Sequence, residues 1–229
     1  MRSVASAKVV SQEAFAQKRF QLSFGLTAAI WIAGLVGHFT PLAEWPALFI
    51  YVVGSIGLTL WHCNQNNDWQ ATYVTNMNLQ ETLKWGGLIG GGLFLMDVGM
   101  AYKHYADGGA PMNQMQGILL DMNLLYLFPI LILAEEFLWR GLMFSALIDR
   151  GMNKHAVVAI TTLFYMLNHF AVAPVGMMER GMMAGMALPI GVVGGYIVAK
   201  TRNVWGSVAL HMITMLSMVV DMLVIPRLF

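Results

Sequence analysis

The chain has 229 residues, of which 58% are hydrophobic and 11% are charged, and its formal net charge is +1. A soluble domain usually carries about 25% charged residues, so this composition and a mean hydropathy of +0.62 indicate a polytopic membrane protein without a separate soluble domain. The small net charge argues against a nucleic-acid partner. The single cysteine, Cys63, excludes an intramolecular disulfide and a cysteine-based zinc site.

The apolar runs predict an all-α, polytopic transmembrane helical bundle of about seven spans, with residues 1–229 forming a single integral-membrane domain. The first apolar run follows a short basic segment and lacks a small-residue cleavage site, so we expect a retained span and not a removed signal peptide. In chain order, the predicted spans cover about residues 22–39, 46–61, 85–102, 117–148, 155–172, 182–199 and 204–225.

Two hydrophilic stretches connect these spans. Residues 62–84 form the longer one, for which we expect a solvated connector that holds an interfacial helix, and residues 103–116 form the second. The span after the longer connector begins with several glycines, including Gly86 and Gly90. Glycines four residues apart on a membrane helix permit close approach of a neighbouring helix, so we expect them to serve packing.

The basic residues indicate an orientation in the membrane. With seven spans and a cytoplasmic N-terminus, ten of the 13 Lys and Arg residues lie on the cytoplasmic side, and only Lys103, Arg180 and Arg227 lie on the other. This asymmetry follows the positive-inside rule. We therefore expect an integral protein, of a bacterial inner membrane, with its N-terminus in the cytoplasm.

Two adjacent carboxylates, Glu135 and Glu136, follow the apolar run of residues 124–133. An ionisable residue within a membrane helix costs about 2.5–3.5 kcal/mol on insertion scales and indicates a function when its partner can be named. Glu136 and Arg140 are four residues apart on one helix face, which favours an ion pair. Glu135 points about 100° away from that face. We therefore expect a structural role for Glu136 and a free, reactive carboxylate at Glu135.

Two histidines, His169 and His211, lie within predicted spans and not at their ends. His169 shares a helical face with Tyr165, and His211 shares one with Ser207 and Thr214. A polar stripe on an apolar membrane helix should face the interior of the bundle and not lipid. Both histidines are therefore candidates for the same interior site as Glu135.

Three motifs occur in one order: Glu135-Glu136-x-x-x-Arg140, then Tyr165-x-x-x-His169, then His211 in a helix that starts near Trp205. Together they resemble the CPBP family, which comprises CAAX prenyl proteases of type II and bacteriocin-processing relatives and is also called the glutamic-type intramembrane proteases. The resemblance covers about residues 124–215, inside a motif-bearing core of about 117–225. Two positions depart from the family pattern, because Tyr165 stands at a usual Phe and Met215 at a usual Asn.

The resemblance implies an intramembrane endopeptidase that hydrolyses a peptide bond of a membrane-associated protein or peptide without a covalent intermediate. It implies that Glu135 is the general base that activates water, that His169 holds this water, and that His211 stabilises the oxyanion. Glu136 and Arg140 would organise the site, and Tyr165 would be a further supporting residue. The implied partners are the lipid bilayer and a membrane-anchored substrate, either a prenylated CAAX tail or a bacterial sorting peptide.

The residue at the usual Asn position raises a question of hydrogen bonding, because the thioether of Met215 cannot donate. Another donor must then help His211 at the oxyanion. Thr214 is the first candidate, since it lies three residues from His211 on the same helical face. Asn168 is the second, although as the neighbour of His169 it should point about 100° away from that histidine.

Three alternatives stay open. Glu135, His169 and His211 could ligate zinc or another divalent ion in a metal-dependent membrane protease, although no HExxH pair is present; otherwise no cofactor or metal is expected. Met215 favours a non-catalytic membrane scaffold or immunity-type protein that keeps the fold. A small transporter with Glu135 in a proton relay ranks last, because the sequence has no evident inverted repeat.

Overall fold

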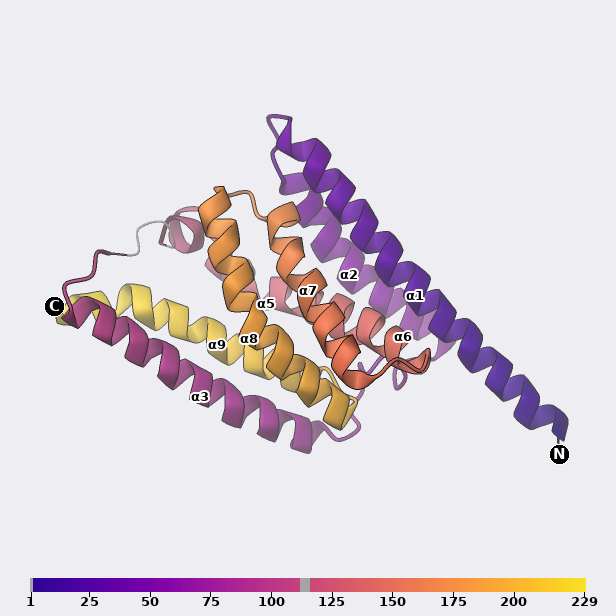
Figure 1. Ribbon diagram of the computed structural model, residues 1–229. Helices are drawn as coiled ribbons and strands as arrows, with labels where there is room; N and C mark the ends of the chain where they lie inside the picture. The colour runs from indigo at the N-terminus through magenta and orange to yellow at the C-terminus, as the bar shows by residue number, and fades with distance from the viewer. Residues whose placement is uncertain (1, 112–115) are drawn as a thin grey trace.

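The computed structural model describes residues 2–111 and 116–229, and every regular element in this part of the chain is a helix (Figure 1), which confirms the all-α prediction for these residues. The elements are α1 (Arg2–His38), α2 (Trp45–Asn66), α3 (Leu79–Ala106), η1 (Gly117–Asp121), α5 (Leu124–Glu136), η2 (Phe137–Met143), α6 (Phe144–Asp149), α7 (Lys154–Val172), α8 (Met177–Thr201), α9 (Trp205–Leu223) and η3 (Ile225–Leu228).

Within residues 2–111 and 116–229, five helical segments are long and apolar enough to cross a membrane, which supports an integral membrane protein. They are Glu13–His38, Trp45–Asn66, Lys154–Val172, Met177–Thr201 and Trp205–Leu228. The predicted number of about seven spans is not confirmed, because α3 and the helical stretch 124–149 are not among the five. Glycines and Asp97 dilute the apolar character of α3, and the other stretch carries Glu135, Glu136 and Arg140 and changes from α to π geometry.

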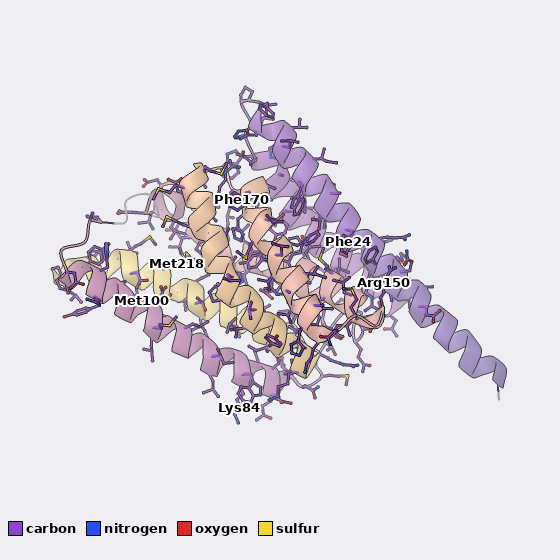
Figure 2. All side chains as sticks on the ribbon, viewed as in Figure 1. Phe24, Lys84, Met100, Arg150, Phe170 and Met218 are labelled. Atoms are coloured by element: carbon purple, nitrogen blue, oxygen red, sulfur yellow. The ribbon has the colours of Figure 1, made fainter. Side chains whose placement is uncertain are left out.

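The first helix packs along the edge of the bundle through aromatic side chains (Figure 2). The ring of Phe24 meets the ring of Phe164 in α7 edge-on at a centroid distance of 5.5 Å. Trp31, two turns further along α1, stacks on the ring of Phe164 at a centroid distance of 5.4 Å. The guanidinium of Arg150, which follows α6, lies 4.1 Å from the ring centroid of Phe20. These contacts fix α1 against α7 and the end of α6.

The third helix crosses α9 at very short range, and the two helices lie side by side in Figure 1. A Cβ atom added to Gly86 would overlap the carbonyl oxygen of Gly206, and one added to Gly90 would lie 3.1 Å from the Cα of Leu210. The predicted packing role of the glycines is thus confirmed at these two positions. By contrast, Gly87 meets no atom within 4 Å. The close crossing fixes the position of α9, which carries His211.

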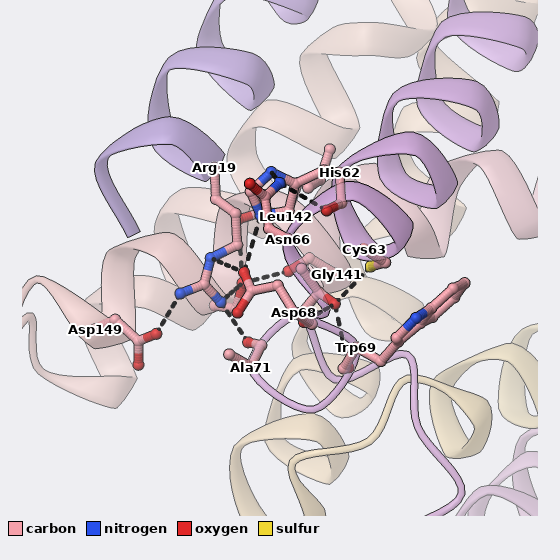
Figure 3. Close-up of polar contacts among 12 residues, drawn as sticks. Arg19, His62, Cys63, Asn66, Asp68, Trp69, Ala71, Gly141, Leu142 and Asp149 are labelled. Carbon is pink, nitrogen blue, oxygen red and sulfur yellow. Dashed lines mark hydrogen bonds and ion pairs between the residues drawn. The ribbon is translucent and has the colours of Figure 1, made fainter. Parts of the chain in front are cut away.

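The connector between α2 and α3 differs from the sequence-based expectation. It spans only residues 67–78, and it contains turns but no helix. Asp68 and Thr72 are buried. Asp68 pairs with Arg19 of α1 and His62 of α2 (Figure 3). The prediction of an interfacial helix was therefore wrong, and the prediction of a solvated connector holds only for part of this segment, since Asn67, Gln70 and residues 76–78 are exposed. The second connector begins after Ala106, and its residues 112–115 lie outside the described part of the chain.

Candidate active site

The central motif lies where α5 changes into a π-helical segment. Glu135 and Glu136 are the last two residues of α5, and η2 follows directly as Phe137–Met143. All seven residues of η2 are buried. A π turn inserts one extra residue per turn into a helix and is common at functional sites. The segment thus alters the register of the helix at the position of the motif.

The ion pair expected from the i, i+4 spacing is present within this segment. Nε of Arg140 lies 3.5 Å from Oε2 of Glu136, and both side chains are fully buried. The guanidinium carbon of Arg140 also lies 4.9 Å from the ring centroid of Tyr165 in α7, within the range of a cation–π contact. Arg140 makes no hydrogen bond to any residue that the structure describes, so these two contacts hold its charge.

The two glutamates differ in their surroundings. The side chain of Glu136 is 0% exposed, whereas that of Glu135 is 14% exposed. Glu135 lines a cavity inside the bundle, and Glu136 does not. The expected separation into a buried, paired carboxylate and an accessible one is therefore present in the geometry.

His211 of α9 contacts both glutamates with one ring nitrogen. Its Nδ1 lies 3.2 Å from Oε1 of Glu136 and 3.6 Å from Oε2 of Glu135. Its other nitrogen, Nε2, lies 3.3 Å from the hydroxyl oxygen of Tyr165. One imidazole thus connects the two carboxylates of α5 with the phenol of α7.

His169 lies one turn after Tyr165 on α7. Its Nδ1 donates a hydrogen bond to the backbone carbonyl of Tyr165 at 3.0 Å. With its proton on Nδ1, the neutral imidazole presents Nε2 as an acceptor. His169 lines the same cavity as Glu135 and His211.

This cavity has a volume of about 80 Å³ and is otherwise apolar. Its lining side chains come from η1, α5, α7, α8 and α9, and the polar ones are Glu135, Tyr165, His169 and His211. A second cavity of about 50 Å³ shares Glu135 and His169 with the first and extends toward Tyr51 of α2 and the α7–α8 connector. The structure therefore brings the three candidate catalytic residues together at one water-sized space.

Two of the supporting candidates lie elsewhere. Oδ1 of Asn168 accepts a hydrogen bond from Nε1 of Trp31 at 3.1 Å, on the side of α7 that faces α1. The hydroxyl of Thr214 donates to the backbone carbonyl of Leu210 at 2.8 Å, and Thr214 does not line the cavity. Met215 does line it. The structure thus does not bring Thr214 to the site as expected, because its side chain turns back to its own helix.

The sequence predicts Tyr165 as a supporting residue on the helical face of His169, but sequence reasoning assigns no role to its hydroxyl. In the structure this hydroxyl contacts His211, and the backbone carbonyl of Tyr165 contacts His169. The sequence did contain a signal for such a role. Relative to the family pattern, a hydrogen-bond donor is lost where Met215 replaces Asn, and one is gained where Tyr165 replaces Phe. Among the described residues, no group of three or more His, Cys, Asp or Glu is placed to hold a metal ion.

The described part of the chain is all-helical, contains five helices able to cross a membrane, and gathers carboxylate and imidazole groups in an interior cavity. This combination defines a polytopic integral-membrane protein with a buried polar site. Residues 118–217 match a family model described as Rce1-like, type II CAAX prenyl endopeptidase Rce1-like. The matched segment contains all three motifs, so the resemblance to the CPBP family is confirmed over these residues and implies a membrane protease. No match was found among curated proteins or among solved structures.

Proposed function

We propose that the chain is an intramembrane endopeptidase that hydrolyses a peptide bond of a membrane-associated protein or peptide with water activated by Glu135. One observation carries this proposal: Glu135 lines the cavity together with His169 and His211, whereas its neighbour Glu136 is buried and paired with Arg140. The family match over the motif-bearing segment supports the same reaction class.

The reaction follows from the positions of these groups. Glu135 takes one proton from a water molecule, while Nε2 of His169 accepts a hydrogen bond from the remaining O–H and orients the oxygen. The water oxygen attacks the carbonyl carbon of the scissile bond and forms a tetrahedral oxyanion. The C–N bond then breaks, and the proton on Glu135 passes to the leaving nitrogen. The products are a carboxylic acid, which ionises, and an amine.

The oxyanion needs hydrogen-bond donors, and we assign this role to the Tyr165 hydroxyl together with His211. Tyr165 and Met215 line the same cavity as His211, and of these two side chains only that of Tyr165 can donate a hydrogen bond. When both ring nitrogens of His211 carry a proton, Nδ1–H donates to Glu136 and Nε2–H donates to the Tyr165 oxygen across their 3.3 Å contact. The phenolic hydrogen is then free to point into the cavity. A fixed donor in a site that excludes water stabilises developing charge more than the same donor in water.

The remaining polar residues position this machinery. Glu136 accepts from Nδ1 of His211 and pairs with Arg140, so it fixes the imidazole ring and compensates the buried guanidinium. The other side chains that line the cavity are apolar, and they include Met183 and Met215. Flexible thioethers adapt to apolar groups of different shape. The lining therefore suits a peptide with apolar side chains beside the scissile bond.

The test is a comparison of protein termini in membranes of cells that produce either the wild-type chain or Glu135→Gln in equal amounts. We expect new N-termini of at least one membrane protein with the wild type and their loss with the variant. Purified wild type and that substrate in liposomes should retain cleavage in a chelator, which separates Glu-activated water from a metal-dependent protease. Identical termini in both cell lines would overturn the proposed hydrolysis and favour a scaffold.

A further inference from the structure

Another cavity, which is polar and has a volume of about 700 Å³, lies at one end of the bundle. It shares no lining residue with the candidate active site. Its wall is formed by the start of the apolar part of α1, the connector 67–78, Asp149 at the end of α6 and Arg202 after α8. Its volume falls within the range of about 300–1,000 Å³ that is typical of sites for small ligands.

The position of this cavity coincides with the ends of several membrane helices. The helix α2 ends at Asn66, α8 ends at Thr201, and α9 begins at Trp205. Tryptophans gather at the same end of the bundle: Trp61 in the last turns of α2, Trp69 in the connector, Trp85 near the start of α3 and Trp205 at the start of α9. Tryptophan is enriched at the level of lipid headgroups. The cavity therefore lies at the membrane–water interface.

One wall of the cavity is held rigidly by Arg19, whose side chain is 1% exposed (Figure 3). Its guanidinium donates to the carbonyl of Ala71 at 2.5 Å and to Ser145 at 3.1 Å. It also pairs with Asp149 at 2.6 Å and with Asp68 at 3.3 Å. One guanidinium thus holds two carboxylates in place, so the wall is preformed and a net negative charge remains on it.

The opposite part of the wall has an unusual backbone. Of the six described non-glycine residues with positive φ, four line this cavity: Asn67 (φ 50°), Tyr73 (φ 61°), Asn78 (φ 54°) and Arg202 (φ 50°). The left-handed region is costly for a bulky residue such as tyrosine. Such strain persists where surrounding structure enforces it, and it clusters at ligand sites. Asn67 and Arg202 are the C-terminal caps of α2 and α8, where this conformation is common, so Tyr73 is the strained position of this wall.

Three polar groups of the wall, the buried Tyr73 and the exposed Glu13 and Arg202, have no partner among the residues that the structure describes. The hydroxyl of Tyr73 and the guanidinium of Arg202 make no hydrogen bond or ion pair there, and neither does the carboxylate of Glu13. Burial raises the pKa of Tyr73, so its hydroxyl stays protonated and can donate. Asp149 uses only Oδ2 for Arg19. The cavity therefore offers free donors for an anion and free acceptors for an ammonium group.

We propose that this cavity binds the zwitterionic headgroup of a phospholipid that carries a phosphate and a primary ammonium, as in phosphatidylethanolamine. The phosphate accepts hydrogen bonds from Arg202 and Tyr73, because a guanidinium and a hydroxyl are its usual partners. The ammonium donates to Glu13 and to the second oxygen of Asp149. The location at the interface favours a lipid over a soluble zwitterion. This site does not depend on the proposed protease activity.

The test measures lipid binding by the purified full chain in detergent, by native mass spectrometry and by thermal unfolding. Phosphatidylethanolamine, phosphatidylcholine and phosphatidylglycerol with identical acyl chains are added in turn. We expect phosphatidylethanolamine to bind at least about tenfold more tightly than the other two. Phosphatidylcholine should bind more weakly because its quaternary ammonium has no N–H donor for Glu13 and Asp149. Phosphatidylglycerol should bind more weakly because its headgroup carries no cation. Arg202→Ala and Tyr73→Phe should each weaken its binding by about tenfold.

The matched control is Lys200→Ala, which removes a basic residue two positions before Arg202. Lys200 pairs with Glu81 at 3.8 Å and lies 3.9 Å from the centroid of the Trp85 ring, outside the cavity. We expect the Lys200→Ala variant to bind phosphatidylethanolamine with the affinity of the wild type. Equal affinity for the three lipids, or equal effects of the Arg202 and Lys200 variants, would overturn the headgroup site. Binding of free glycerophosphoethanolamine as tightly as the lipid would overturn the lipid assignment in favour of a soluble zwitterion.

Discussion

The hydroxyl oxygen of Tyr165 lies 3.3 Å from Nε2 of His211, and this contact joins α7 to α9 at the candidate active site. The same residue accepts a hydrogen bond from His169 through its backbone carbonyl, at 3.0 Å. Its ring lies against Arg140. A phenylalanine at this position would keep the ring and the carbonyl and would lose only the hydroxyl. One substitution can therefore isolate the role of that oxygen.

We expect Tyr165→Phe to lower the rate of peptide-bond cleavage by roughly 10²–10³, which is the usual effect of removing one oxyanion donor. The amount of folded protein and its melting temperature should change little, because the ring contact with Arg140 remains. The measurement is cleavage in liposomes of the membrane protein that the comparison of termini identifies.

The matched rescue is the double variant Tyr165→Phe with Met215→Asn. Met215 lines the same cavity, and an asparagine there supplies an amide donor. We expect the double variant to recover part of the lost rate. Wild-type activity of the single Tyr165→Phe variant would show that the phenol takes no part in the reaction.

Thr214→Val should leave cleavage unchanged, in contrast to the large loss expected from its position in the sequence alone. The hydroxyl of Thr214 already donates to the carbonyl of Leu210 at 2.8 Å, and the residue does not line the cavity. The same liposome assay compares this variant with Tyr165→Phe. A loss for Thr214→Val as large as that for Tyr165→Phe would return the donor role to the threonine.

Parts of the site that depend on one helix were predictable from the sequence, whereas contacts between helices, such as that of Tyr165, were not. The Glu136–Arg140 pair follows from spacing along one helix, and local geometry is sufficient for it. The interior position of His169 and His211 follows from polar stripes on apolar helices. The contact between Tyr165 and His211 joins two helices, and no periodicity within either helix encodes it. The π geometry of η2 likewise has no local signal in the sequence.

The fold shows the same limit. Apolar runs predicted most of the helices, but the connector 67–78 was misjudged because its polar residues have partners far away in the sequence. Asp68 pairs with Arg19, and the carbonyl of Ala71 accepts a hydrogen bond from the same guanidinium. Polar composition alone cannot distinguish a solvated loop from one whose side chains are paired inside the protein.

The two adjacent glutamates should respond differently to the same substitution. We expect Glu135→Gln to abolish cleavage without a change in melting temperature, because this carboxylate faces the cavity. Glu136→Gln removes the negative charge beside the fully buried Arg140 and leaves one acceptor oxygen for Arg140 and His211 together. Breaking a buried ion pair costs about 3–5 kcal/mol. Thermal unfolding in detergent measures both variants, and equal destabilisation would contradict the division of roles.

The glycine contact between α3 and α9 should be sensitive at one position and tolerant at the next. Gly86→Ala places a methyl group against the carbonyl oxygen of Gly206, so the helices must separate. Overpacking of this kind costs about 1–3 kcal/mol and should also lower cleavage, since α9 carries His211. The control is Gly87→Ala, which meets no atom within 4 Å and should be neutral or stabilising by up to about 1 kcal/mol. Equal melting temperatures for the two variants would show that the crossing is not close.

Glu44, the last residue of the turn between α1 and α2, connects this turn to α8. Its Oε1 lies 2.5 Å from Nη2 of Arg180 and 2.8 Å from Nδ1 of His38. Arg180 also donates to the backbone carbonyl of Phe170, at 2.6 Å. Burial acts to raise the pKa of Glu44, but the hydrogen bonds from Arg180 and His38 outweigh it, so this pKa lies below its ordinary value of 4.5.

A group whose pKa is lower in the folded than in the unfolded state stabilises the fold above the unfolded value, and this contribution is lost as the pH falls through the folded value. Ionised Glu44 should therefore stabilise the protein above pH 4.5 and lose this effect below it. We expect Glu44→Gln to lower the melting temperature at pH 7 and the difference from wild type to shrink as the pH falls below 4.5. The control is Glu81→Gln, since Glu81 is half exposed and its 3.8 Å pair with Lys200 is weak. Melting curves in detergent that stay parallel for wild type and Glu44→Gln down to about pH 3.5 would contradict the assignment of this pH dependence to Glu44.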